Sequence, residues 1–432
     1  MKSFRDFISE IDREGMLRKV KRPVSPGLEL ASVLSYSGKS PVLFESVAGS
    51  QWRAVGNVFP TRELVARYLG TDKKGILPAL AGAIKSPSLP GEVPAESAPV
   101  MENTVSEPDL SLFPIPIHTE KDGGPYIASA IVVANDPEHG RNSSFHRMMV
   151  IGRDRLAVRI LPRHLNEYIT RAGGTLDVAV VIGSPINVLL ASAISVGLGD
   201  DEFGIANALM PFSTVKLGNG VSVPADAEIA FEATITEEMH DEGPFVDLTE
   251  TYDILRKQRV MRVNRIHHRN NPIFHALLPG GLEHKILMGM PREPTIFNEV
   301  DKVCECKEVN ITPGGCSWLH GVVSISKKSE DDARKAIDAA FRGHKSMKHV
   351  VVVDDDIDVF SPQEVEWAIA TRVQADRDVH IFPGQKGSSL DPSADPSTCI
   401  TAKVGIDATM PLGRRSEFAR AKYLDIRIGD YI

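Results

Sequence analysis

The chain has 432 residues, of which 42% are hydrophobic and 25% charged, as expected for a large globular protein of two or three domains. Its net charge of −8 argues against a nucleic-acid partner, because such proteins normally carry a basic surface. No apolar run is long enough to cross a bilayer, and four cysteines are too few for a disulfide framework. We therefore expect a cytoplasmic protein without membrane contact.

The first region, residues 1–105, mixes helical and extended patterns. Apolar spacing predicts helices over Phe4–Glu14 and Thr61–Leu69, and a short strand covers Pro41–Phe44. A connector rich in proline and acidic residues, Pro87–Pro116, then interrupts regular structure. We expect an N-terminal α/β region.

The second region, residues 106–290, is dense in β-branched residues. Strands of this number and spacing indicate a barrel or a folded-over sheet. The predicted strands are Ala128–Ala134, Arg147–Ile151, Leu156–Ile160, Val178–Ile182 and Ala227–Thr236.

The last region, residues 291–432, alternates strands and helices. Gly321–Ser326 precedes a helix that begins near Ser329, and His349–Val353 precedes a helix over Pro362–Arg372. This βαβ pattern predicts a sheet covered by helices. A further amphipathic helix over Arg414–Tyr423 could reach a neighbouring subunit.

Familiar cofactor and nucleophile signatures are missing. The sequence contains neither Gly-x-Gly-x-x-Gly after a strand, nor a Walker A loop, nor a Gly-x-Ser-x-Gly elbow. The pair Cys304 and Cys306 alternates with polar residues and is better explained by a strand with half-buried thiols than by a metal site. Any cofactor must be held by a less familiar site.

Two carboxylates flank a Gly-Pro turn in Glu242–Asp247, and Arg147 ends the run Asn142–Arg147. Like charges close together raise the pKa of one acid, which suits it to donate a proton near neutral pH. The arginine could hold a carboxylate substrate beside them. The alternative is a surface turn with solvated acids.

A metal site can also be argued from residue types. Asn142, His164 and Glu202 supply an amide oxygen, an imidazole and a carboxylate, which suit a divalent ion. Thirteen histidines leave many other choices, and the pair His267–His268 is an equal candidate. One histidine of such a pair more often packs or caps while the other meets solvent.

Seven motifs follow one another along the chain: Asn142–Arg147, Leu161–His164, Asp201–Leu209, Glu242–Asp247, Val353–Asp358, Gly387–Pro392 and Gly405–Thr409. In this order they resemble the motifs of the UbiD family of decarboxylases, and the resemblance runs essentially end to end. This family uses prenylated flavin mononucleotide (prenylated FMN), an electron sink for a carbanion that no side chain can delocalise.

The resemblance implies roles for individual residues. Arg147 would hold the substrate carboxylate and pair with Glu242, while Asp247 would protonate the carbon after CO2 leaves. Mn²⁺ or Mg²⁺ would bridge to the flavin phosphate, and K⁺ would occupy a second site. The implied divalent ligands are Asn142, His164 and Glu202; the K⁺ site is Ala191, Ser192 and Ile194; further cofactor contacts are Ser144, Phe145, His146, Arg163 and Lys386.

Two departures from the family pattern bear on the substrate. Asp247 stands where glutamate is often found, and Ser143 where some members that act on aromatic acids carry tryptophan. The chain looks more like compact archaeal-type members, some of which decarboxylate trans-anhydromevalonate 5-phosphate in isoprenoid synthesis. The phosphate of such a substrate needs cations, for which we consider Arg159, Arg163, Arg265 and Arg269.

The resemblance also implies a fold and partners. We expect a central split β-barrel of the flavin-reductase kind, a C-terminal α/β domain, a homodimer or hexamer, and a flavin prenyltransferase as cofactor supplier. The alternatives are a decarboxylase of hydroxybenzoate-type aromatic acids, a flavin-free metal-dependent lyase or hydrolase built on His164, Glu202 and His267, and a non-catalytic flavin-binding subunit.

Overall fold

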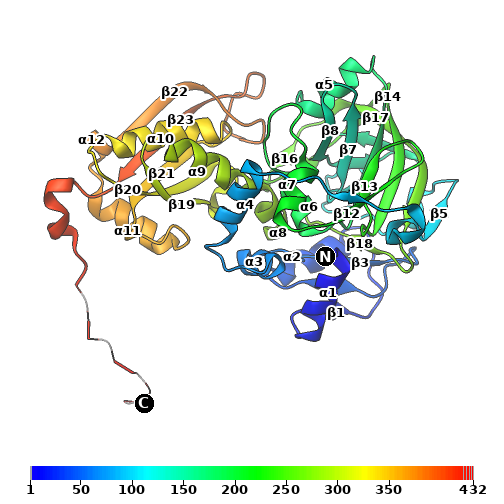
Figure 1. The fold of residues 1–432 in the computed structure, drawn as a ribbon, viewed down its shortest axis with the longest axis horizontal. Helices are drawn as coiled ribbons and strands as arrows, with labels where there is room; N and C mark the ends of the chain where they lie inside the picture. The colour runs from blue at the N-terminus through cyan, green and yellow to red at the C-terminus, as the bar shows by residue number, and fades with distance from the viewer. Residues whose placement is uncertain (1, 422, 425, 428, 430, 432) are drawn as a thin grey trace.

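A computed structural model describes residues 2–421, 423, 424, 426, 427, 429 and 431. Three main sheets follow one another along the chain, and the parts that contain the central and C-terminal sheets lie side by side (Figure 1). The fold is mixed α/β, as expected. Among the described residues, every helix is too short or too polar to cross a membrane.

The N-terminal sheet is small and borrows its last strand from far along the chain. Its order is β1-β2-β3-β18, with β3 and β18 parallel. Its strands are β1 (Arg18–Val20), β2 (Val42–Phe44), β3 (Arg53–Gly56) and β18 (Ile273–His275), and its helices are α1 (Phe4–Arg13), α2 (Glu29–Ser37), α3 (Arg62–Leu69) and α4 (Ile76–Lys85).

The central sheet has nine strands, in the order β6-β9-β10-β17-β14-β11-β7-β8, with β5 also paired to β17. Within the described chain this is an open path whose ends do not pair, so the expected split barrel is not confirmed. The strands are β5 (Asn103–Val105), β6 (Tyr126–Ile127), β7 (Ile131–Asp136), β8 (Gly140–Phe145), β9 (Met148–Val150), β10 (Arg155–Val158), β11 (Leu176–Ile182), β14 (Ile229–Glu242) and β17 (Arg256–His268).

Smaller elements attach to the central sheet and carry much of the site. Two short sheets, β13-β12-β4 and β15-β16, accompany four helices and a 3-10 turn. Their bounds are β4 (Gly91–Glu92), β12 (Ser213–Lys216), β13 (Ser222–Pro224), β15 (Phe245–Val246), β16 (Tyr252–Asp253), α5 (His164–Arg171), α6 (Ile186–Ala191), α7 (Glu202–Leu209), α8 (Leu282–Gly289) and η4 (Met290–Arg292).

The C-terminal sheet confirms the predicted βαβ pattern. Strands β20 and β21 are parallel and joined through α10, and separate apolar clusters pack on the two faces of the sheet. The order is β19 (Glu305–Ile311), β20 (His320–Ser326), β21 (His349–Asp354), β23 (Ile400–Ala408) and β22 (Val379–Lys386), with α9 (Glu293–Asp301), α10 (Asp332–Gly343), α11 (Pro362–Arg372) and α12 (Ala375–Asp378).

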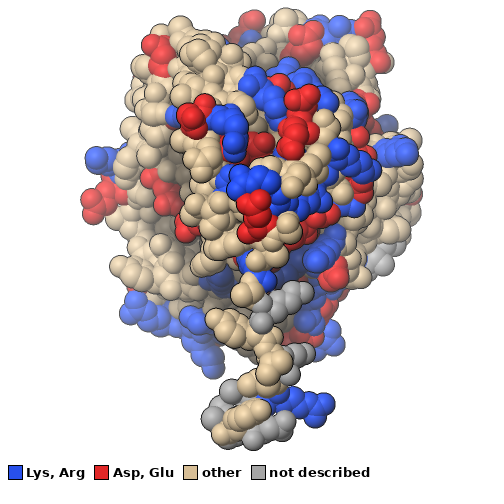
Figure 2. All heavy atoms as spheres, turned by 90° about the vertical axis from the view of Figure 1, so that its left-hand side faces the viewer, with Lys and Arg blue, Asp and Glu red and all other residues tan. Residues whose placement is uncertain are grey.

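The helix expected over Arg414–Tyr423 is wrong for the described residues. A 3-10 segment, Leu412–Phe418, takes its place, has non-helical backbone at Arg414 and buries no side chain; residue 422 lies outside the described residues. None of the side chains of Leu412–Phe418 is buried, so the segment lacks the burial of an apolar face that stabilises an amphipathic helix. On the face of the C-terminal part that Figure 2 shows, acidic and basic side chains are interspersed.

The predicted boundaries at residues 105 and 290 stay a prediction. β5 pairs with the central sheet just before the first of them, and β18 joins the N-terminal sheet from within the central region. Two apolar clusters each combine residues of the N-terminal and central regions.

Candidate active site

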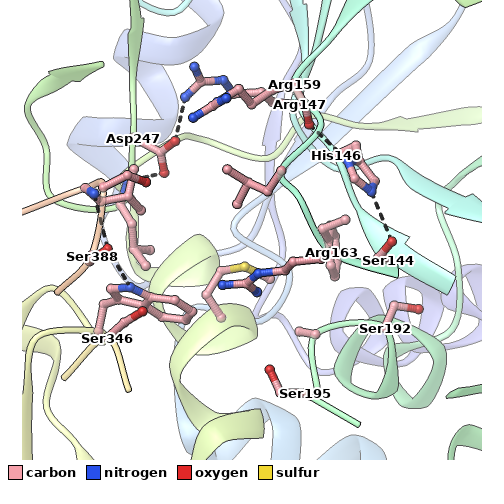
Figure 3. Close-up of a pocket in the computed structure, with 18 of the residues that line it drawn as sticks. Ser144, His146, Arg147, Arg159, Arg163, Ser192, Ser195, Asp247, Ser346 and Ser388 are labelled. Atoms are coloured by element: carbon pink, nitrogen blue, oxygen red, sulfur yellow. Dashed lines mark hydrogen bonds and ion pairs between the residues drawn. The ribbon is translucent and has the colours of Figure 1, made fainter. Parts of the chain in front are cut away.

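A cavity of about 690 Å³ opens between the central and C-terminal parts of the molecule (Figure 3). This volume lies in the range of sites that bury a cofactor or a small ligand. Its walls come from β8, the start of α5, the end of α6, the β15 turn, α8 and the loops around Trp318 and Ser388.

Arg147 lies at one end of the cavity and binds both predicted acids. Its Nε and Nη2 donate to the two carboxylate oxygens of Glu242 at 2.9 and 3.1 Å. Its Nη1 donates to Oδ2 of Asp247 at 2.7 Å. The three residues predicted from widely separated positions therefore form one cluster, with the cation between the two acids, and the solvated-turn alternative is wrong.

A third carboxylate, which we did not predict, completes this cluster. Nη2 of Arg147 donates to Oδ2 of Asp253 at 2.8 Å, and Asp253 also pairs with Arg256. Burial alone would lower the pKa of Arg147, but the three carboxylates raise it above its ordinary value. The guanidinium is thus permanently charged and held in a defined plane.

The β15–β16 hairpin explains why Asp247 and Asp253 meet at the same arginine. Phe245 lies opposite Asp253 in the register, and the backbone N–H of Asp247 donates to the carbonyl of Thr251 at 3.2 Å. Gly243 begins this segment with φ of +103°, where a side chain would be strained and would approach the Ile254 carbonyl to 3.0 Å.

Glu242 is supported from behind the cavity. It is 0% exposed, and the hydroxyl of Tyr126 donates to its Oε1 at 3.0 Å. The ring of Phe245 lies 4.3 Å from that of Tyr126 and 4.9 Å from the Arg147 guanidinium, centre to centre. Burial, and then the Glu242 carboxylate, raise the pKa of Tyr126, so the phenol stays a hydrogen-bond donor.

Asn142 and Glu202 form a second cluster on another wall of the cavity. Nδ2 of Asn142 donates to Oε1 of Glu202 at 2.9 Å, and the backbone N–H of Ser143 donates to Oε2 at 2.8 Å. Glu202 is 2% exposed, and burial raises its pKa to about 8. A buried carboxylate without a cationic side chain beside it, within the described chain, suits a metal ion.

His164, the third predicted metal ligand, starts α5 and lines the same cavity. Burial lowers its pKa, which favours the neutral, ligating form of the imidazole. Within the described residues no group of three His, Cys, Asp or Glu side chains is arranged as a metal site. The predicted set of Asn142, His164 and Glu202 contains only two residues of these types, because its third ligand is an amide.

The predicted K⁺ residues lie at the end of α6, of which Ala191 is the last residue. Ala191 and Ile194 are buried, and the hydroxyl of Ser192 lies 2.6 Å from that of Ser143. Ser192 and Ile194 line the cavity, and Ala191 is not part of its wall. The Ala191 carbonyl accepts from the backbone N–H of Ile194 at 3.0 Å.

His146 has a defined tautomer. Its Nδ1 lies 2.9 Å from the carbonyl of Arg159, which can only accept, so Nδ1 carries the proton and Nε2 accepts from the Ser144 hydroxyl at 3.0 Å. Burial lowers the pKa of His146 to about 4, so the ring is neutral at pH 7. Figure 3 shows this chain of contacts along one wall.

The other predicted cofactor residues also reach the cavity. Phe145, Arg163 and Lys386 line it, and Arg163 points into it in Figure 3. Nζ of Lys386 donates to the carbonyl of Thr398 at 2.9 Å. Within the described chain, Arg163 has no ion pair, so its charge is available to a ligand.

Several predicted residues lie elsewhere. His267 donates to or accepts from Thr104 and Glu232 through its two ring nitrogens and is absent from the cavity wall. The site of His164, Glu202 and His267 is therefore not formed. Arg265 and Arg269 pair with Glu232 and with the Asp226 carbonyl, so of the four arginines considered for a phosphate only Arg159 and Arg163 line the cavity.

Further lining residues were missed from the sequence. His284 on α8 accepts the backbone N–H of Gly280 at Nδ1, so its proton is on Nε2. Arg292 and Trp318 lie together at another part of the wall. The only available signal was the spacing of eight residues between His284 and Arg292, which places both on one side of a helical segment.

Comparison with known proteins gives the family. The chain matches three 3-octaprenyl-4-hydroxybenzoate carboxy-lyase (UbiD) domains in order: the N-terminal domain over residues 8–84, the Rift-related domain over 91–282 and the C-terminal domain over 285–408. The three matches together cover most of the chain, including the residues of the arginine–carboxylate cluster. The chain belongs to the UbiD family.

Individual relatives cover nearly the whole chain. It is 44% identical over 427 residues to the anhydromevalonate phosphate decarboxylase of Methanosarcina mazei, covering 97% of this chain and 99% of that protein. It is 45% identical over 399 residues to the protein of that name from Methanocaldococcus jannaschii, covering 90% and 93%.

Solved structures agree with this. The UbiD-class enzyme HmfF from Pelotomaculum thermopropionicum in complex with FMN superposes with a TM-score of 0.95 at 39% identity, covering 100% of both chains. The vanillic acid decarboxylase of Sedimentibacter hydroxybenzoicus in open form gives a TM-score of 0.88 at 29% identity, covering 99% and 97%.

Proposed function

We propose that this enzyme is a prenylated-FMN-dependent decarboxylase of trans-anhydromevalonate 5-phosphate, acting in isoprenoid biosynthesis. The observation that carries the proposal is the Arg147 cluster at the end of a cavity of cofactor size. The relatives with 44% and 45% identity supply the substrate class through their names.

The residues around the cavity fit a phosphorylated cofactor with a metal ion. Asn142, His164 and Glu202 would hold Mn²⁺ or Mg²⁺, because the uncompensated Glu202 carboxylate and its raised pKa call for a cation. Ala191, Ser192 and Ile194 would hold K⁺. The cofactor contacts would come from Asn142, Ser144, Phe145, His146, Arg163, His164 and Lys386.

When bound, the prenylated flavin supplies the electron sink for the carbanion that forms as CO2 leaves. Arg147 binds the substrate carboxylate through its planar fork, with Glu242 fixing the plane. Nη1 is taken by Asp247, so the incoming carboxylate replaces Asp247 there. This exchange frees the Asp247 carboxyl to take up a proton and face the substrate.

Asp247 then delivers its proton to the carbon that has lost CO2. A C–H bond forms as the Oδ–H bond breaks, and the resulting carboxylate can return to Nη1 of Arg147. Aspartate is shorter than glutamate by about 1.5 Å, one carbon–carbon bond, so the substrate carbon must lie closer or a water must relay the proton.

The proposal is tested with protein produced together with a flavin prenyltransferase, the proposed cofactor supplier. A flavin absorbance band, the mass of the prenylated cofactor and CO2 release from the unsaturated acid phosphate are expected. Release of CO2 from a hydroxybenzoate but not from the phosphate would favour the aromatic-acid alternative. Hydrolysis or elimination without flavin would favour the metal-dependent alternative.

Assembly is part of the proposal. We expect a homodimer or a hexamer, since family members are multimeric and one structural relative is an evolved dimeric form. Light scattering of the purified protein measures this directly, and a monomer at micromolar concentration would contradict it.

A further inference from the structure

Arg292 is a buried cation without a counter-charge. It ends η4, directly after α8, and is 7% exposed. Nη1 donates to the hydroxyl of Ser195, and the guanidinium lies 5.1 Å from the centre of the Trp318 ring. Its Nε is buried and has no hydrogen-bond partner, and within the described chain no carboxylate pairs with it.

This environment differs sharply from that of Arg147, which shares the same cavity. Arg147 is compensated by three carboxylates, whereas the contacts of the Arg292 side chain with described residues are a hydroxyl and an aromatic face. Burial, and then the positive charge of Arg163, lower the pKa of Arg292 to about 9, so it is still a cation at pH 7. Burying such a charge is costly unless an anion joins it.

The surroundings of Arg292 are held in place. The indole N–H of Trp318 donates to Ser388 at 3.1 Å, and its carbonyl accepts from Nε2 of His344 at 3.0 Å. The His344 ring also packs edge-on against the indole, at 4.6 Å between centres. A pre-organised wall of this kind costs no ordering energy when a ligand binds.

The chemistry of the wall favours a phosphate monoester. Arg163 acts electrostatically on Arg292, and among the described residues neither cation has an ion pair. The hydroxyl-bearing residues Ser195 and Ser346 line the same cavity as these two arginines. Two cations and hydroxyl donors match a dianion with three oxygen acceptors better than a single carboxylate.

The position of Arg292 matches the far end of an acid held by Arg147. Burial lowers the pKa of His284, and the nearby Asp247 carboxylate opposes this, which places His284 at the Arg147 end. Arg292 follows His284 by eight residues, roughly 12 Å along a helical axis at 1.5 Å per residue. A short unsaturated acid with a terminal phosphate can reach from one arginine toward the other.

We propose that Arg292, assisted by Arg163 and backed by Trp318, binds the phosphate group of the substrate and selects phosphorylated acids over unphosphorylated ones. This inference rests on the proposed function. The cofactor also carries a phosphate of the same chemistry, so the test must separate the two sources.

The test compares wild type with Arg292→Gln, both loaded with cofactor, in binding and in turnover. Calorimetry should show that the variant binds the acid phosphate about 10- to 100-fold more weakly, as expected for loss of a charged hydrogen-bond partner. Binding of the dephosphorylated acid should be unchanged, and inorganic phosphate should compete in wild type only. Arg292→Lys should recover part of the preference, and Arg334→Gln, on the exposed side of α10, is the matched control.

The outcomes separate the possibilities. Equal weakening for both acids, or unchanged preference for the phosphate, would overturn the inference. Loss of flavin from Arg292→Gln with unchanged discrimination would assign the residue to the cofactor phosphate and also overturn it. If wild type releases no CO2 from the acid phosphate, the proposed function fails instead. Thermal melting and the flavin-to-protein ratio show whether a variant is folded.

Discussion

Asp247 and Arg147 are bound to each other, with Oδ2 of the aspartate 2.7 Å from Nη1 of the arginine. Asp247, the proposed proton donor, therefore accepts a hydrogen bond from the same N–H of Arg147 that is proposed to bind the substrate carboxylate. If Arg147 binds the substrate carboxylate as proposed, binding of substrate and release of Asp247 are one exchange, and the acid is freed only when a substrate is present.

Replacing Asp247 with asparagine should separate binding from protonation. We expect decarboxylation to fall by about 10²- to 10⁴-fold, the usual contribution of a general acid, while substrate binds at least as tightly. CO2 release and equilibrium binding measure the two effects. Asp247→Glu should keep activity within about tenfold, because a proton donor remains.

The control for this variant is Asp241→Asn, which removes an exposed carboxylate paired with Lys257. It should behave as wild type. Retention of more than a tenth of the activity by Asp247→Asn would remove this residue from the proton-transfer step.

Glu242→Ala should destabilise the fold. The variant removes one of the three carboxylates that balance the buried Arg147 cation, and it removes the acceptor of the Tyr126 hydroxyl. Breaking a buried pair from one side costs about 3–5 kcal/mol. Urea denaturation should show this loss in the free energy of unfolding, while Asp241→Ala should change it by less than about 0.5 kcal/mol. Equal stability of the two variants would contradict the structural role of Glu242.

Mn²⁺ should stabilise the wild-type protein through Glu202. At a free concentration 100 times the Kd, binding adds about 2.7 kcal/mol to the free energy of unfolding. Glu202→Gln should melt near wild type without metal and show little response to Mn²⁺. A chelator should lower both the melting temperature and the retained flavin of wild type, and an unchanged response of the variant to Mn²⁺ would exclude Glu202 as a ligand.

Acid should destabilise the protein partly through His146. Burial holds its folded-state pKa at about 4, below the ordinary value of 6.5, so between these values the unfolded chain binds more protons. The free energy of unfolding should therefore fall as pH drops from about 6.5 toward 4. His146→Asn should reduce this slope, while its difference from wild type should be constant above pH 7.5. An identical slope in both proteins would show that His146 titrates normally.

Local sequence patterns predicted part of the regular structure. The helix over Pro362–Arg372 has the predicted bounds, and the strand–helix–strand order of the C-terminal part is as expected. The helix over Arg414–Tyr423 was wrong for the described residues, because an amphipathic pattern needs burial of its apolar face and no side chain of Leu412–Phe418 is buried.

The site was predicted in part. Arg147, Glu242 and Asp247 were named from motifs, and the structure brings them together. Asp253 was missed because it reaches Arg147 only through the β15–β16 hairpin. Arg292 was missed because its spacing from His284 is by itself too weak a signal to mark a site.

The amino-acid sequence by itself determined the fold class, the family and the residue types available for chemistry. These follow from local periodicity and from short motifs, which can be recognised without knowledge of the tertiary structure. Tertiary structure alone decided the charge balance. Whether a cation is compensated depends on which carboxylates long-range packing brings within hydrogen-bonding distance, and this leaves Arg147 with three acids and Arg292, in the described chain, with none.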